Sequence, residues 1–180
     1  WDGEVWTEKN HYAPSMSTEM YGAAAYCPGV NEYSGSFYQF GGIRIGPPSL
    51  AEPSGEGYLR FPLYDSWNIG PSSRNLARLG HSIVWDAERQ TMVLYGGVFR
   101  ATEQNDVFLS DVWEWSDQWV TWKQASQPPA GVGARAYHGA CWSEALGAMV
   151  VFGGQGPSVK RNDTWTYDGV EWRRGPIPPA

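Results

Sequence analysis

The chain is expected to be an all-β protein built from repeated four-stranded units, and two observations predict this fold class. Paired glycines beginning at Gly41, Gly96 and Gly153 recur 55 and then 57 residues apart, and each pair closes a run of apolar and aromatic residues. The 180 residues include 22 Gly, 13 Pro and 11 Trp, a composition that disfavours long helices and suits half-buried strands. Self-similarity at a nearly fixed period therefore sets the architecture.

The second and third repeats each divide into four short strands. In both, an Arg lies 18 residues and a His 15 residues before the first glycine of the pair. The third strand carries Asp-x-Trp-x-aromatic, which has the period of two that a sheet with one buried face requires. The expected strands are 80–85, 91–97, 111–116 and 119–123 in the second repeat, and 137–142, 148–154, 163–167 and 171–174 in the third.

The first repeat allows two registers. Asp65-Ser66-Trp67 looks like the Asp-x-Trp of a third strand, but this register leaves no room for a fourth strand. The other register places Tyr58 in the third strand and Trp67 in the fourth, and it reproduces the aromatic spacing of the second repeat. We adopt this register, which predicts strands at 21–26, 36–42, 57–61 and 64–68.

Both ends of the chain are in phase with the repeat. Residues 1–6 mirror residues 167–172, and the closing Pro-Pro-Ala follows Trp172 at the spacing by which another Pro-Pro-Ala follows Trp122. We expect one domain, with the outer strand of a preceding unit at 1–10 and units at 11–70, 71–127 and 128–180. Further units are expected from a longer parent polypeptide or from a second copy of this chain.

These residues resemble the kelch repeat, which has an Arg and a His before an inner strand, an apolar strand closed by Gly-Gly, and spaced aromatics ending in Trp. The resemblance is weaker in the first repeat, where Tyr21 takes the His position and no Arg matches. It implies a partial kelch-type β-propeller of four-stranded antiparallel blades, with the first strand of each blade innermost. Propellers close with about 4–8 blades, so three blades need further ones.

Arg78 and Arg135 are the first candidates for a binding site, and two roles stay open for them. The resemblance implies that such an Arg binds acidic side chains at the propeller mouth, where a planar guanidinium suits carboxylates. The alternative, which we favour, is an ion pair within or between blades, with Asp106 or Asp163 as the acidic partner.

The connections between the second and third strands differ in length, and repeat proteins place binding residues in such variable segments. These connections, 43–56, 98–110 and 155–162, are expected to be loops on the face that carries the two Arg residues. The candidate partner-binding residues within them are Arg44, Arg100, Asn105, Lys160 and Arg161.

The large aromatic residues of the strands are expected to fill the spaces between blades, because each buries a large apolar area. The residues expected to be mostly buried are Tyr95, Trp113, Trp122, Phe152, Trp165 and Trp172.

Composition excludes several kinds of site. The net charge of -6 argues against a nucleic-acid partner, and no apolar run is long enough for a membrane span. His81 and His138 recur at one repeat position, which favours hydrogen-bonded core residues, and no spacing of metal ligands is present. Cys27 and Cys141 are expected to be buried thiols and not a disulfide, since their repeats are not neighbours.

No nucleophile motif, metal set or cofactor motif stands out, so no catalytic residue and no cofactor are predicted. Some kelch relatives are copper oxidases, but the histidines here have other assignments. We expect a non-catalytic recognition or scaffold module that binds a protein segment or a glycan at the loop-rich face. The alternative is a fragment of a larger propeller enzyme, oxidase-like or sugar-processing, whose catalytic groups lie in blades outside this sequence.

Overall fold

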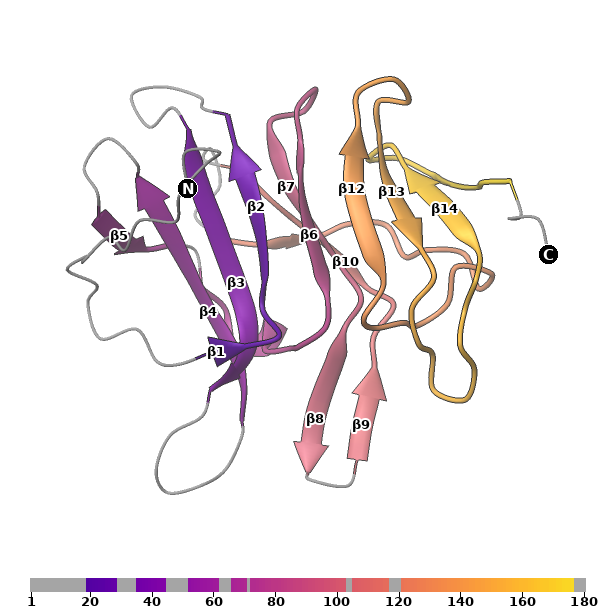
Figure 1. Ribbon diagram of the computed structural model, residues 1–180, viewed down its shortest axis with the longest axis horizontal. Coiled ribbons are helices and arrows are strands. Elements are labelled where there is room, and N and C mark those ends of the chain that lie inside the picture. The colour runs from indigo at the N-terminus through magenta and orange to yellow at the C-terminus, as the bar shows by residue number, and fades with distance from the viewer. Residues whose placement is uncertain are drawn as a thin grey trace, which may run out of the picture.

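The computed structural model describes residues 19–28, 35–44, 52–61, 66–70, 72–102, 105–116 and 121–176. Three antiparallel sheets follow one another along the chain, and each is formed by strands close together in sequence (Figure 1). The predicted all-β fold with four-stranded antiparallel sheets is confirmed. Among these residues the longest helix is the three-residue 3-10 turn η3 at Arg74–Leu76. The strand expected within residues 1–10 lies outside the described residues.

The first sheet has the strand order β1-β3-β4-β5, and β2 pairs with the other part of β3. Tyr58 lies in β4 and Trp67 in β5, so the register chosen for the first repeat is confirmed. The strands of this sheet are β1 (Glu19–Met20), β2 (Ala23–Cys27), β3 (Ser36–Arg44), β4 (Glu52–Phe61) and β5 (Ser66–Ile69).

The second and third sheets each contain four strands in sequence order from the inner edge to the outer edge. The outer strand β11 begins later than expected and is only two residues long. The second sheet consists of β6 (Ser82–Asp86), β7 (Thr91–Tyr95), β10 (Val112–Trp115) and β11 (Lys123–Gln124). The third consists of β12 (Gly139–Ser143), β13 (Ala148–Phe152), β14 (Thr164–Tyr167) and β15 (Trp172–Arg174).

In two of the three connections expected to be loops, the described residues form paired strands instead. In the second sheet, β8 (Val98–Thr102) and β9 (Asn105–Phe108) form a separate two-stranded hairpin. In the first, β3 and β4 stay paired beyond an irregularity between Phe40 and Gly42. The prediction of loops was wrong here because paired strands satisfy the backbone polar groups of a long connection, even where its composition is polar.

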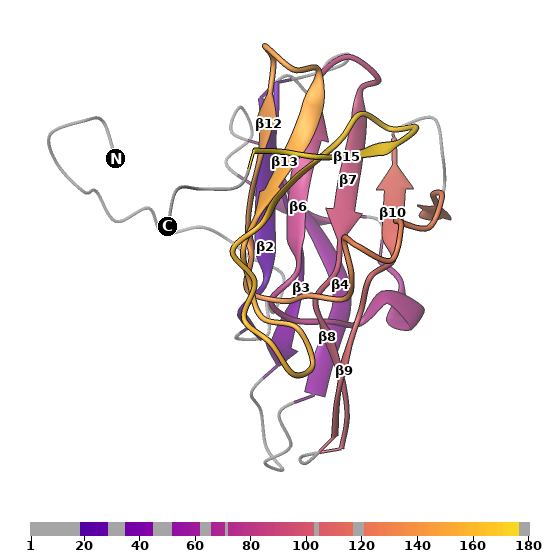
Figure 2. The ribbon, with the colours of Figure 1, turned by 90° about the vertical axis from the view of Figure 1, so that its right-hand side faces the viewer.

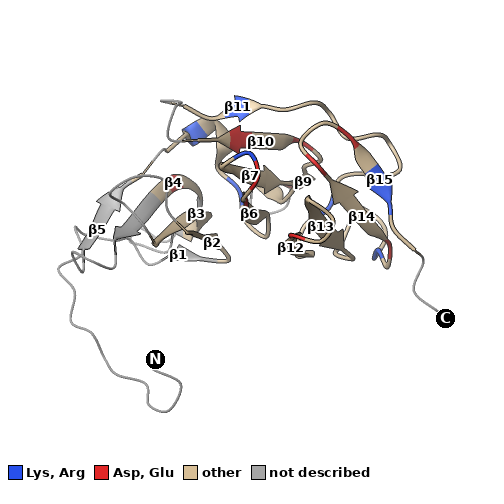
Figure 3. Ribbon diagram, turned by 90° about the horizontal axis from the view of Figure 1, so that it is seen from above, with Lys and Arg blue, Asp and Glu red and all other residues tan. Residues whose placement is uncertain are grey.

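Seen from above, the three sheets form an arc (Figure 3). The first strands β2, β6 and β12 lie along the concave side, and the last strands of the second and third sheets, β11 and β15, lie along the convex side. Strand β6 contacts both β2 and β12. The first strand of each repeat is therefore innermost, as the resemblance implied.

Aromatic side chains fill the spaces between successive sheets. Phe40 of β3 is fully buried. Its ring centroid lies 5.8 Å from that of His81 and 5.4 Å from that of Trp122, both in the next repeat. One sheet further along, Tyr95 takes the same place, with His138 at 5.2 Å and Trp172 at 4.9 Å. The aromatic residue that precedes Gly-Gly is thus covered by the next sheet, through the His just before its inner strand and a Trp at or just before the start of its outer strand.

Burial agrees only in part with expectation. Tyr95 and Trp122 are buried, whereas Trp113, Trp165 and Trp172 are only partly buried. The prediction for Phe152 was wrong, because its side chain is 50% exposed. Phe152 occupies the place of Tyr95 in the third sheet, and no described residue supplies the His and Trp that would cover it. Burial of this residue type depends on the next sheet and not on its own strand.

The strand register also corrects the alignment of the first repeat. Ala23 pairs with Phe40 as Ser82 pairs with Tyr95, so Gly22, and not Tyr21, takes the position of the repeated His. Tyr21 corresponds instead to the residue before that His, which is Gly80 in the second repeat. Aromatic character alone misled the sequence alignment, because an aromatic residue stood one position from where a His was expected.

Neither cysteine forms a disulfide, as expected. Their predicted burial was wrong, since Cys141 is exposed and Cys27 is only partly buried. Cys141 lies on β12 opposite Val150, and it shares the uncovered side of the third sheet with Phe152.

Candidate functional site

The described residues of the connections between the second and third strands lie at the same end of the molecule in all three sheets (Figures 1 and 2). The β8–β9 hairpin projects there beside the adjoining ends of β3 and β4, and the third sheet contributes the segment 155–161. The inner strands also begin at this end, just after Tyr21, Gly80 and Tyr137. We call this end the loop-rich face.

Arg78 is buried at the loop-rich face, with 2% of its side chain exposed. Its Nη1 donates to Gly96 O at 3.0 Å and to Asp111 Oδ1 at 2.7 Å, while Nη2 donates to Asp111 Oδ2 at 2.9 Å. Trp113 Nε1 donates to the same carboxylate at 2.5 Å. One guanidinium therefore ties the end of the second strand to the start of the third.

The third sheet repeats this arrangement around Arg135, which is fully buried. Arg135 donates to Gly153 O at 3.1 Å and to the two Asp163 oxygens at 2.8 and 3.1 Å, and Trp165 Nε1 donates to Asp163 at 2.7 Å. The constant spacing of 18 residues thus separates each Arg from the glycine whose carbonyl accepts its hydrogen bond. The Arg–Asp separation is 33 residues in the second repeat and 28 in the third, and the β8–β9 hairpin absorbs the difference.

Electrostatics keeps both aspartates ionised. Burial alone would raise the pKa of Asp111, but the hydrogen bonds and charge of Arg78 outweigh it and lower the pKa below its usual value. Asp163 is affected in the same way by burial, Arg135 and Trp165, with a net lowering of its pKa. The geometry matches the ion-pair alternative for both Arg residues. Asp163 was an expected partner, whereas Asp106, the other, pairs with Arg100.

The Gly-Gly pairs join neighbouring sheets where only a residue without Cβ fits. Gly96 and Gly97 have φ values of 65° and 103°, and Gly97 N–H donates to Arg135 O of the next repeat at 2.9 Å. A Cβ on Gly96 would lie 2.6 Å from that same carbonyl oxygen. A side chain at this position would therefore force the two sheets apart.

The two repeated histidines are buried, but they differ in hydrogen bonding. His138 Nε2 lies 2.8 Å from the Ser82 hydroxyl of the preceding sheet. The backbone of Phe40 lies beside His81, yet neither ring nitrogen reaches a partner with hydrogen-bond geometry. The reason is visible in the repeat, because Ala23 stands where Ser82 would supply a hydroxyl. The prediction of a hydrogen-bonded core His is confirmed for Nε2 of His138, whereas Nδ1 of His138 and both ring nitrogens of His81 have no hydrogen-bond partner among the described residues.

Burial keeps both imidazoles neutral. Burial, and then the charges of Arg78 and His138, lower the pKa of His81 to about 3. Burial and the charge of Arg135 lower the pKa of His138 to about 4. A neutral, buried His138 bonded to Ser82 lacks the exposure that a general base for a bound substrate needs.

The other predicted residues are spread over the loop-rich face. Arg100 and Asp106 form an ion pair across the β8–β9 hairpin at 3.0 Å, with 29% and 39% of their side chains exposed. Asn105 and Lys160 are exposed, and Arg161 is partly buried, close enough to Gly133 that a Cβ added there would collide with its Nη2. Arg44 ends β3, and its backbone pairs with Glu19 and Glu52.

Sequence reasoning did not identify Tyr21 and Tyr137 as site residues. Both have left-handed backbones, with φ values of 62° and 57°, and their side chains are 59% and 50% exposed. This conformation costs a non-glycine residue roughly 1–2 kcal/mol. The available signal was the alignment of both residues with Gly80, where φ is 61°. Correct placement of the first repeat would have revealed it.

No cluster of His, Cys, Asp or Glu suited to a metal ion occurs among the residues that the structure describes. Within the same residues, no helix has the length and apolar character needed to cross a bilayer.

Four-stranded antiparallel blades in an arc, with Gly-Gly pairs between them, define the fold as that of a segment of a kelch-type β-propeller. Among solved structures, the chain is similar to YjhT, a kelch-repeat propeller protein, with a TM-score of 0.71 and 13% identity. The match covers 90% of this chain and 53% of YjhT, so the chain spans about half the length of that protein. In all, 128 solved chains match, and so widespread a fold assigns no function. No family model and no curated protein match the sequence.

Proposed function

We propose that this chain is part of a non-catalytic recognition or scaffold module, which binds a protein segment or a glycan at the loop-rich face. The observation that carries the proposal is that the polar residues shared by the repeats and those that differ between repeats lie in different parts of the fold. The residues that the repeats share make hydrogen bonds within the fold. Arg78 and Arg135 each donate to an aspartate and to a glycine carbonyl. The residues that differ between repeats are presented on the surface.

The contact residues of this proposal are those of the variable connections. Arg100 and Asn105 lie on a hairpin that extends beyond the sheets, and Lys160 lies on the third connection (Figure 1). Arg161 follows Lys160 in the third connection, and Arg44 belongs to the first connection. Arg78 and Arg135 hold the sheets from which the connections project. Binding residues on loops held by a rigid scaffold are a general arrangement.

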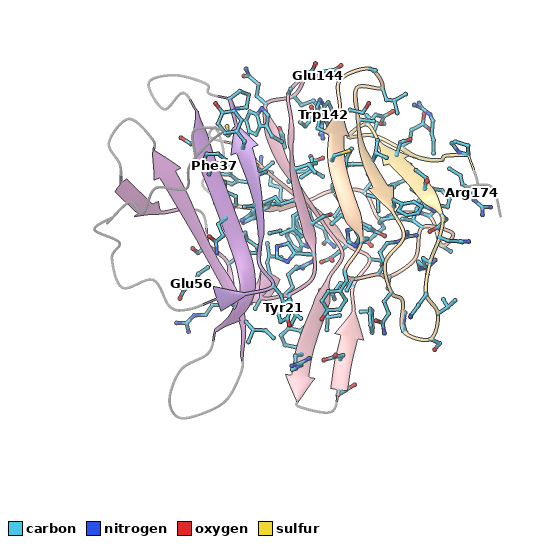
Figure 4. The ribbon with its side chains drawn as sticks, in the orientation of Figure 1. Tyr21, Phe37, Glu56, Trp142, Glu144 and Arg174 are labelled. Atoms are coloured by element: carbon cyan, nitrogen blue, oxygen red, sulfur yellow. The ribbon has the colours of Figure 1, made fainter. Side chains whose placement is uncertain are left out.

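The test is a screen of the intact chain against a random peptide library and a glycan array, followed by mapping of each binder with paired variants. The R100A/N105A double variant should weaken binding at least tenfold. The Glu144→Ala variant, at the opposite end of the molecule, should leave binding unchanged (Figure 4). Binders that bind the R100A/N105A variant as well as the parent but are lost in Glu144→Ala would contradict the proposal, as would the absence of any binder.

The partners proposed for the open ends of the arc are further blades, from a longer polypeptide or from another copy. Phe40 and Tyr95 are each covered by a His and a Trp of the next sheet, while Phe152 is half exposed. The native mass of the 180-residue chain tests this proposal, together with the parent polypeptide if one exists. A stable 20.0 kDa monomer that is complete as the natural product would refute it.

The enzyme alternative places the catalytic groups in other blades. In this chain, the Ser82–His138 contact is buried and therefore closed to a substrate. We therefore assign this chain no catalytic residue.

A further inference from the structure

Two exposed tyrosines meet at the loop-rich face. The ring centroids of Tyr21 and Tyr137 lie 6.4 Å apart, and the rings meet edge to face with an interplanar angle of 81°, although they belong to the first and third repeats. Gly80 of the intervening repeat lies between them in the repeat pattern, and a Cβ there would come within 2.6 Å of the Tyr137 ring. The glycine of the middle repeat therefore leaves room for the ring of the third. Figure 4 labels Tyr21 at this end, above the β8–β9 hairpin.

The backbone at these positions shows that the fold does not require tyrosine. Tyr21, Gly80 and Tyr137 all have positive φ, and they are linked by hydrogen bonds from Gly80 N–H to Tyr21 O and from Tyr137 N–H to Gly80 O. Glycine forms the same structure in the middle repeat without strain. Two large residues in a strained conformation, with half or more of each side chain in solvent, contribute little to the core. Strain of this kind concentrates at functional sites.

The described charged side chains that act on the pair, Arg100 and Asp106, carry balanced charge. Val98, at the base of β8, pairs with Leu79 next to Gly80, which places the hairpin beside the tyrosines. Burial, followed by the negative charge of Asp106, raises the pKa of Tyr137, while Arg100 opposes this shift. The Tyr137 hydroxyl thus stays protonated beside an ion pair whose charges cancel.

We propose that Tyr21 and Tyr137, together with the Arg100–Asp106 pair, form a binding site for a neutral saccharide. An aromatic face suits the C–H face of a sugar ring. The planar guanidinium and the carboxylate offer donors and acceptors to its hydroxyl groups. This inference rests on the proposed function and names one ligand class for it.

Two features favour a neutral saccharide over a peptide or a charged ligand. The backbone N–H groups of Gly80 and Tyr137 are already bonded within the fold, so this segment offers no open edge for strand addition by a peptide. Arg100 and Asp106, which act on Tyr137, are paired with each other, so these described residues offer no unpaired charge to an anion or a cation. Recognition here has to come from side chains.

The experiment is an NMR titration of the intact chain with 13C-labelled tyrosine rings. The probes are maltose, cellobiose and lactose, with glucuronic acid as the charged probe and decaproline as the peptide probe. A neutral disaccharide should shift the ring signals of Tyr21 and Tyr137 saturably, and the signals are assigned by their loss in Tyr21→Gly and Tyr137→Gly. Tyr137→Gly should weaken binding at least tenfold without lowering the unfolding midpoint, because Gly80 shows that glycine fits.

The matched control is Gln90→Gly. Gln90 also has positive φ, at 53°, but it lies in the turn between β6 and β7 at the opposite end. Its replacement should leave the saccharide affinity unchanged. The proposal is overturned if no disaccharide binds, if Tyr137→Gly binds as well as the parent, or if glucuronic acid or decaproline binds more tightly. Array binders that still map to R100A/N105A would then leave the proposed function standing.

Discussion

Replacement of Arg135 by Met is the most direct test of whether the repeated Arg is part of the scaffold. The substitution keeps much of the side-chain length and removes the charge. It would delete the bidentate contact with Asp163 and the hydrogen bonds to Gly153 O and Val132 O, all made by a side chain with no exposed surface. The carboxylate of Asp163 would keep only the Trp165 donor at 2.7 Å among these partners.

The expected loss is about 3–5 kcal/mol of unfolding free energy, which is the usual result of breaking a buried ion pair on one side. Because domains are stable by only about 5–15 kcal/mol, a loss of this size is easily measured. The assay is urea-induced unfolding at pH 7 followed by tryptophan fluorescence, with the midpoint and slope fitted together.

Arg100→Met provides the matched control on the same face. Its ion pair with Asp106 is partly exposed on both sides, so its removal should cost at most about 1 kcal/mol. A loss below about 1 kcal/mol for Arg135→Met, or an equal loss for both variants, would refute the scaffold role. It would return Arg135 to the list of ligand-binding residues.

Three further outcomes are expected. Ala23→Ser should raise the unfolding free energy by about 0.5–1.5 kcal/mol, because it offers His81 a hydroxyl, and an unchanged urea midpoint would contradict this. Stability should fall as the pH drops below about 6.5, since His81 and His138 take up protons when unfolded but, with pKa values of about 3 and 4, stay neutral when folded. More protons bind to the unfolded state in this window, so the slope, up to about 1.4 kcal/mol per pH unit for each imidazole, should diminish in His138→Gln. Trp122→Ala should cost about 3–5 kcal/mol, whereas Phe152→Ala, at a half-exposed site, should cost much less. Equal losses in urea melts would mean that Phe152 is covered.

The sequence alone determined the features that depend on spacing along one repeat. The Gly-Gly period identified the strands, because the glycines mark where a strand ends and the next repeat approaches closely. The Arg and Asp-x-Trp positions belong to one sheet, so their spacing follows the hydrogen bonds that join Arg78 to Gly96 and Asp111. Even in the ambiguous first repeat, Tyr58 and Trp67 placed the third and fourth strands correctly, since distances between neighbouring strands vary little, although the first strand was misaligned by one residue.

Only the tertiary structure decided the features that depend on a neighbouring sheet. Tyr95 and Phe152 have the same place in their strands, yet one is buried and the other half exposed, because a following sheet covers only the first. His138 finds Ser82 across the interface, while His81 meets the position of Ala23. The contact between Tyr21 and Tyr137 joins residues 116 positions apart (137 − 21). Such contacts depend on how whole sheets are arranged around the arc, and the pattern within a single strand carries no record of them.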